Sequence, residues 1–170
     1  MWRWGGTLLL SALLVSAMGG AGSAQQVRSE RLAGGNENPP VISDGSGTFR
    51  ARLLSDRAAF RLRYDIPSSE ILQAHLHIAN PGQNGLIVVF LCTNLGNTPG
   101  GATPRGCPDS PGEVTGDIVA GDVQPIADII DAGDLDGLLI LARQGSLYVN
   151  VHTGDHTGGE IRGQVSPRRR

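Results

Sequence analysis

The stretch Tyr148–Gln164, YVNVHTGDHTGGEIRGQ, decides the fold because it has the pattern of a β-hairpin. Apolar Val149 and Val151 alternate with polar residues in its first arm, as Ile161 and Val165 do in its second. Successive side chains of a strand point to opposite faces, so this period of two predicts one apolar and one polar face. Glycines and an aspartate between the arms are turn residues. The hairpin therefore turns one face to a core and leaves a polar face for function.

The same alternation recurs upstream and predicts six more strands, over residues 27–33, 48–54, 60–66, 71–78, 86–92 and 114–120. The run at 86–92 is continuously apolar, which is typical of a strand buried on both sides. About eight short strands separated by turn signals predict a mainly β protein, an antiparallel β-sandwich of immunoglobulin-like or superoxide-dismutase-like architecture.

Residues 125–144 follow a helical period instead. Pro125 can begin a first helical turn, Asp134 can cap a second, and Gly145 suits a C-terminal end. We expect a short helical insert around 125–144 that covers one end or edge of the sandwich.

The two ends of the chain lie outside the expected domain. Residues 1–24 have a positive start at Arg3, an apolar run over 7–17 and small residues at 22–24, which predicts a signal peptide cleaved after Ala24. The folded domain is expected over 27–166, and the basic tail 167–170 is expected to be disordered. We therefore expect a secreted, periplasmic or cell-surface location.

The charge of the chain argues against nucleic acid as a partner. Its formal net charge is −2, with 14 basic and 16 acidic residues. Past the leader no stretch is long and apolar enough to predict membrane insertion. Arginines alternate with apolar residues on the 48–66 hairpin, which indicates a solvated outer face or a surface for anions or glycans.

Two cysteines, Cys92 and Cys107, are present in a chain expected to be exported. An even number of cysteines in an oxidising compartment predicts one disulfide. It would staple a segment rich in glycine and proline.

Polar residues on two strands are the candidate binding site. Leu76 and Ile78 should face the core, so His75 and His77 should lie on the outer side, and the same argument places His152 outside. If these strands are neighbours, three imidazoles converge, a set that suits zinc or copper. The alternative is a hydrogen-bonded polar network without metal. The full candidate set is His75, His77, Asn150, His152, Glu160 and Arg162.

Five segments resemble the CHRD domain, which is named from chordin, an extracellular regulator of bone morphogenetic proteins. They are ENPPV at 37–41, AHLHI at 74–78, NGLIV at 84–88, GSLYVNVHT at 145–153 and GEIRGQ at 159–164, in the family's order. The resemblance covers about residues 27–165 and implies a secreted, stand-alone β-rich module. It supplies no catalytic residues to carry over.

These observations predict a binding or structural module outside the cytoplasm, with an extracytoplasmic protein or a glycan as partner. The alternative is a copper- or zinc-binding β-sandwich that uses His75, His77 and His152, with redox chemistry as one use of the metal. We do not expect an enzyme, because no nucleophile elbow, phosphate-binding glycine loop or pair of catalytic acids stands out.

Overall fold

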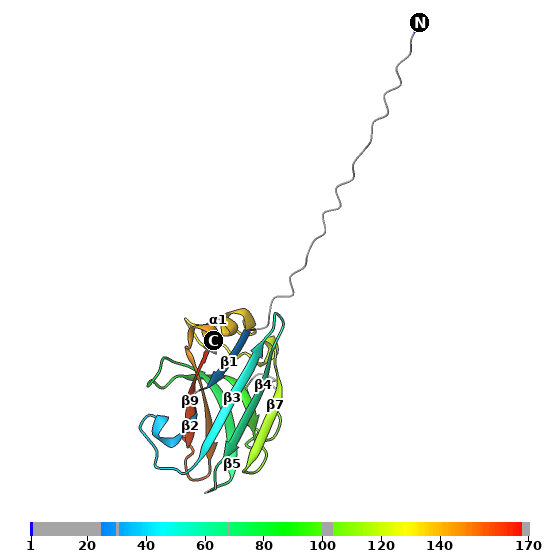
Figure 1. Ribbon diagram of the computed structural model, residues 1–170. Coiled ribbons are helices and arrows are strands. Elements are labelled where there is room, and N and C mark those ends of the chain that lie inside the picture. Colours follow the sequence, from blue (N-terminus) through cyan, green and yellow to red (C-terminus); the bar gives the residue numbers. More distant parts are fainter. Residues whose placement is uncertain (2–24, 30, 68, 100–103, 168–170) are drawn as a thin grey trace.

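The computed structural model describes residues 1, 25–29, 31–67, 69–99 and 104–167 (Figure 1). The described chain forms nine strands: β1 Gln25–Ser29, β2 Leu32–Ala33, β3 Ser46–Leu53, β4 Ala58–Asp65, β5 Ile71–Ile78, β6 Leu86–Thr93, β7 Gly112–Ile118, β8 Leu147–Thr153 and β9 Ile161–Pro167. One α-helix, α1, spans Leu135–Gln144, and two single 3-10 turns lie at Gly34–Asn36 and Ala120–Asp122.

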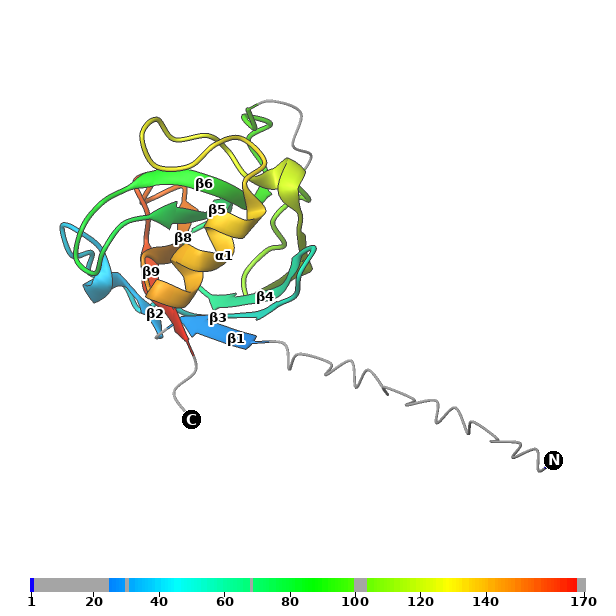
Figure 2. The same cartoon turned by 90° about the horizontal axis from the view of Figure 1, so that it is seen from above.

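All nine strands belong to one antiparallel sheet of order β6-β5-β8-β9-β1-β3-β4-β7, and the short β2 pairs with both β3 and β9. The sheet curls so that its two halves face each other, with α1 across one open end (Figure 2). This arrangement confirms the predicted mainly β, sandwich-type fold.

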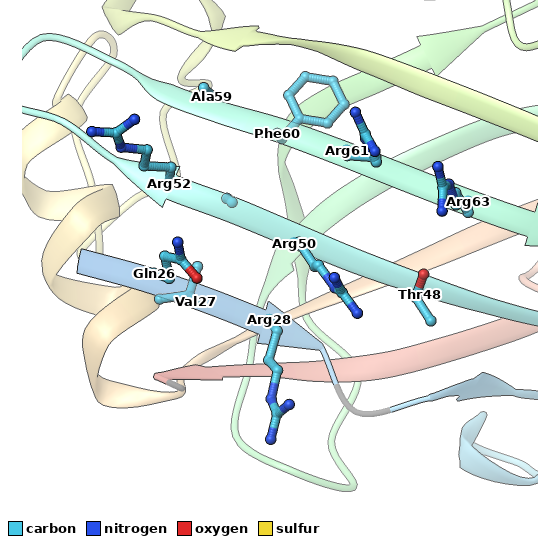
Figure 3. Close-up of a pocket in the computed structure, with 11 residues that line it drawn as sticks. Gln26, Val27, Arg28, Thr48, Arg50, Arg52, Ala59, Phe60, Arg61 and Arg63 are labelled. Carbon is cyan, nitrogen blue, oxygen red and sulfur yellow. The ribbon is translucent and has the colours of Figure 1, made fainter. Parts of the chain in front are cut away.

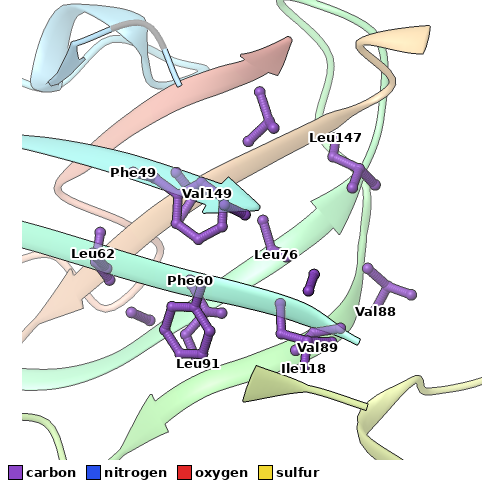
Figure 4. Packing of buried hydrophobic residues seen from close by; sticks show 14 of the residues in the cluster. Phe49, Phe60, Leu62, Leu76, Val88, Val89, Leu91, Ile118, Leu147 and Val149 are labelled. Carbon is purple, nitrogen blue, oxygen red and sulfur yellow. The ribbon is translucent and has the colours of Figure 1, made fainter. Parts of the chain in front are cut away.

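The core lies between the two halves of the sheet (Figure 4). Phe49 and Leu62 from β3 and β4 meet Leu76 and Val149 from β5 and β8, and each of these side chains is at most 3% exposed. Burying a side chain of this size contributes about 1.5–3 kcal/mol. The alternation read from the sequence therefore sets which face of each strand is inside.

The helical insert predicted for 125–144 is right for its second part and wrong for its first. Asp134 accepts a hydrogen bond from the Gly137 amide, and Gly145 ends α1 in the left-handed region at φ 78°. Ile126 and Ile130 instead form an isolated β-bridge. Asp128 between them has φ 63°, which a continuous right-handed helix does not allow.

Two expected boundaries and the expected burial of one strand also change. The strand expected over 27–33 is two strands, β1 and β2. Pro167, placed in the tail, is the last residue of β9. Strand β6 is at one end of the pairing order and not buried on both sides, since Leu86 is 66% exposed. The predicted signal peptide and the arginines of the tail lie outside the described residues.

The predicted disulfide between Cys92 and Cys107 is confirmed. It ties β6 to the loop before β7, and both cysteines are buried. Within the described part of the chain, no helix has the length and apolar character needed to cross a membrane.

Candidate functional site: a buried histidine cluster

Strands β5 and β8 are neighbours, as the three-histidine hypothesis required. In their register His75 is opposite Asn150, His77 is opposite Tyr148, and Gln73 is opposite His152. Ring centroids lie 4.8 Å apart for His75 and His152, and 6.4 Å apart for His77 and His152. The sequence alternation therefore brings the three imidazoles together on one face.

This face is not the open surface that the sequence suggested. His75, His77 and His152 are only 0%, 7% and 6% exposed. Two loops cover the rings. The carbonyl of Gly85 in one loop contacts His77, and the carbonyl of Thr157 in the other contacts His152. The alternation in a strand shows which face is turned away from the main core. It does not show whether that face is exposed, because loops can cover it.

The hydrogen bonds fix where each ring carries its proton. His152 Nδ1 lies 2.9 Å from the Thr157 carbonyl oxygen, and His77 Nδ1 lies 3.0 Å from the Gly85 carbonyl oxygen. A carbonyl only accepts, so both Nδ1 atoms donate and both Nε2 atoms keep lone pairs. His75 Nδ1 lies 3.1 Å from His152 Nε2 and can donate to it. Among the described residues, Nε2 of His75 and Nε2 of His77 have no hydrogen-bond partner.

The three imidazoles are neutral at neutral pH. Burial, followed by the nearby His152 and His77, lowers the pKa of His75 to about 2. Burial also lowers the pKa of His77 to about 4, although its bond to Gly85 opposes this shift. The pKa of His152 is lowered by burial too. Neutral imidazole is the form that binds metal ions.

Aromatic side chains hold the rings in place. The ring of His77 stacks on Tyr148 at 4.7 Å, and the guanidinium of Arg162 lies 4.7 Å from the centroid of Tyr148. Phe90 of β6 meets His75 edge-on at 4.5 Å. Ring orientation is therefore set by packing, as a preformed binding site needs.

Of the other predicted site residues, two join the cluster and one does not. The side-chain amide of Asn150 lies 3.1 Å from His152 Nε2 and can donate to it from the NH2 group once the amide is turned by 180°. Arg162 is directly opposite Asn150 and contacts the cluster through Tyr148. Glu160 instead accepts hydrogen bonds from Ser43 and Thr153, both 2.6 Å long. That carboxylate fastens the loop between β2 and β3, through Ser43, to the β8–β9 hairpin.

Sequence reasoning missed Glu37 as a site residue. It is 7% exposed, its Oε2 lies 3.8 Å from Arg162 Nε, and its Oε1 has no hydrogen-bond partner in the described chain. Burial raises the pKa of Glu37 to about 7, and Arg162 partly opposes this. An acidic residue close to two prolines is typical of an exposed loop. No sequence pattern indicated that Glu37 would contact Arg162 of β9. Tyr148 and Phe90 were missed because they resemble ordinary strand residues.

The cluster can be tested for its fit to a metal ion. One nitrogen from each histidine lies within 4.8 Å of the others. Two nitrogens that share a tetrahedral ion at Zn–N distances near 2.05 Å are about 3.3 Å apart. A pair at the 4.8 Å bound must therefore close by roughly 1.5 Å, which requires the rings to rotate about their χ angles when the ion binds. For His152 to be the third ligand, its Nε2 lone pair must be released from the hydrogen bond with His75 Nδ1. The three imidazoles then suit zinc or copper, with one coordination position left open.

A comparison with protein families matched the CHRD domain over residues 29–165. The chain belongs to the CHRD domain family. The match includes β2 to β8, nearly all of β9, and the whole histidine cluster. No curated protein and no solved structure matched this CHRD chain. Family membership, the disulfide and the fold agree with an extracellular module.

Proposed function

We propose that this CHRD domain works outside the cytoplasm as a binding module without catalysis of its own, and that the ligand best matched to its site is a zinc or copper ion. The extracellular character of the family and the Cys92–Cys107 disulfide support the location.

One observation carries the metal assignment: two buried nitrogens with lone pairs, His75 Nε2 and His77 Nε2, have no partner among the described residues. Leaving a buried polar atom unsatisfied costs about 1–3 kcal/mol. A metal ion removes that cost, because it accepts a lone pair from each ring. Without metal, each lone pair would need a donor other than the hydrogen bonds described above.

The available ligands narrow the choice of ion. Both cysteines are consumed by the disulfide, so thiolate is not offered. Imidazole ligands favour zinc or copper over calcium or magnesium, which prefer oxygen. Copper would allow redox chemistry, and zinc would not.

Metal analysis of mature protein purified from its native location tests the proposal. We expect about one zinc or copper ion per chain. Calorimetry on chelator-treated protein should show saturable binding of Zn²⁺ or Cu²⁺, and His77→Ala should abolish it. His156→Ala is the matched control, since His156 is a histidine outside the cluster. If His77→Ala does not fold, His77→Gln keeps a polar side chain there and serves instead.

Wild-type protein that contains no metal and gives no binding heat would overturn the metal assignment. The cluster would then be a polar network, and the ligand of the module would lie elsewhere on the domain.

A further inference from the structure

Five arginines line one hollow on the outer face of β1, β3 and β4, away from the histidine cluster. The hollow has a volume of about 550 Å³ (Figure 3). All five side chains are exposed and lie on three strands that are neighbours in the sheet. We call them the arginine surface: Arg28, Arg50, Arg52, Arg61 and Arg63.

Strand register places three of these arginines in a row. Arg28 is directly opposite Arg50, and Arg50 is directly opposite Arg61. Like charges directly opposite each other destabilise a sheet. A solvated outer face gains nothing from this placement, since polar neutral residues would solvate it as well. The row therefore concentrates positive charge on this face at an electrostatic cost to the sheet.

The row is only partly neutralised by the protein itself. Glu113 of β7 forms ion pairs with Arg63 and, at 3.6 Å, with Arg61. For Arg28, Arg50 and Arg52, the described residues provide no ion pair. In a chain of net charge −2, this surface stays positive and presents guanidinium forks, which match carboxylate and sulfate groups.

We propose that the arginine surface binds a linear acidic polysaccharide, through carboxylate or sulfate groups carried in series along the chain. The inference rests on the proposed function, since it names a ligand class for an extracytoplasmic binding module. The row across three strands suits an extended polyanion better than a single small anion, which one guanidinium pair would satisfy.

The absence of apolar anchors on this face favours a polysaccharide over a membrane or a protein. Among the described residues, the exposed large hydrophobic side chains lie on other elements: Met1, Ile42, Leu86, Leu95, Val119, Ile129 and Ile140. A peripheral membrane surface would insert such side chains, and protein interfaces centre on buried aromatic or aliphatic anchors.

Binding of the purified mature chain to immobilised polymers tests the proposal. The probes are polygalacturonate for carboxylate, dextran sulfate for sulfate, and unmodified dextran as the neutral polymer. We expect binding to at least one acidic polymer and none to dextran. Raising salt from about 50 mM to about 300 mM should weaken it strongly, because exposed charges are screened.

Two triple variants distinguish the effect of the arginine surface on binding from the effect of the overall charge of the protein. Arg28→Gln/Arg50→Gln/Arg61→Gln removes the row, and we expect affinity to fall about tenfold or more, as losing charge-assisted contacts implies. Arg31→Gln/Arg57→Gln/Arg143→Gln loses the same charge outside the hollow and should bind like wild type. The row variant should melt no lower than wild type, because like-charge repulsion is relieved. The single Arg50→Gln is the fallback if it does not fold.

The proposal is overturned if neither acidic polymer binds at the lower salt, or if both triple variants lose affinity equally. Equal or tighter binding to phosphatidylserine vesicles than to the polymers would also overturn it, in favour of a membrane. Metal content is measured on the same preparations. Protein without metal that still binds an acidic polymer would contradict the metal assignment alone, and metal-containing protein that binds no polymer would contradict this proposal alone.

Discussion

Glu37 Oε2 and Arg162 Nε lie 3.8 Å apart, and both side chains are about 5–6% exposed. Removing two charges from water is costly, and their attraction only partly repays it. Here burial has the larger effect on the carboxyl group, because the pKa of Glu37 is raised to about 7 in spite of Arg162. The pair joins the loop after β2 to β9, directly beside the histidines.

The free energy of unfolding of the metal-free protein should fall on acidification. The pKa values of His75 and His77 are lowered to about 2 and about 4, so both histidines stay neutral in the fold while the unfolded chain protonates below pH 6.5. Each proton costs about 1.4 kcal/mol per pH unit. The raised pKa of Glu37 offsets one of these protons, and the lowered pKa of His152 adds a contribution of the same sign as those of His75 and His77, so a net loss of stability remains between pH 6.5 and 4.5. Urea unfolding at three pH values measures it, and a flat profile would contradict it.

Glu37→Gln should make that pH dependence steeper. A raised pKa stabilises the fold below the unfolded value of 4.5, and this contribution is lost as pH rises through about 7. Without this carboxyl group the folded protein no longer takes up the proton of Glu37, so the loss of stability on acidification should become steeper by up to about one proton. Because the substitution also removes the partner of Arg162, it changes the free energy of unfolding at every pH. The quantity to compare is therefore the slope of this free energy against pH. An unchanged slope would mean that Glu37 is ionised throughout.

Gly159→Ala should destabilise the domain and disturb the site. Gly159 has φ 123°, and an added Cβ would lie 2.8 Å from both Asn150 Nδ2 and Glu37 Oε1. Strain of this kind costs about 2 kcal/mol or more. Gly158→Ala is the matched control, because nothing lies within 4 Å of its added Cβ. Thermal unfolding compares the two, and equal midpoints would refute the prediction.

The double variant Cys92→Ser/Cys107→Ser should lose about 3 kcal/mol, because the disulfide closes a loop of about this length in the unfolded chain. Denaturant unfolding under non-reducing conditions measures the loss. Reducing agent should destabilise wild type by a similar amount and leave the variant unchanged. A variant as stable as wild type would show that the loop is held by other contacts, such as those of Asn94.

Natively produced protein should begin at Gln25. The positive start, apolar run and small residues of 1–24 predict cleavage after Ala24. N-terminal sequencing and intact mass of material recovered outside the cytoplasm check this directly. Full-length chain retained inside the cell would contradict both the predicted export and the proposed function outside the cytoplasm.

Much of the fold could be read from the sequence because alternation is a local signal. Val149 and Val151 show which face of β8 is inside, and the same holds for Leu76 in β5. Adjacency of the two strands could only be a hypothesis, since strands far apart in the chain can pair in many orders. Burial of the histidines could not be predicted, because it depends on loops that close over them. Glu37 was missed for the same reason.

The position of β1 has a consequence for how the chain assembles. Val27 is opposite Ala51 of β3 on one side and Pro167 of β9 on the other, so the first and last strands of the domain meet in the middle of the sheet. Otherwise only the two-residue β2 bridges β3 and β9. A chain emerging N-terminus first can form the hairpins on either side early, but the seam between them closes only when its last residues arrive. A product shortened at either end would keep its hairpins and lose the seam, which makes intact termini a condition for a protease-resistant domain.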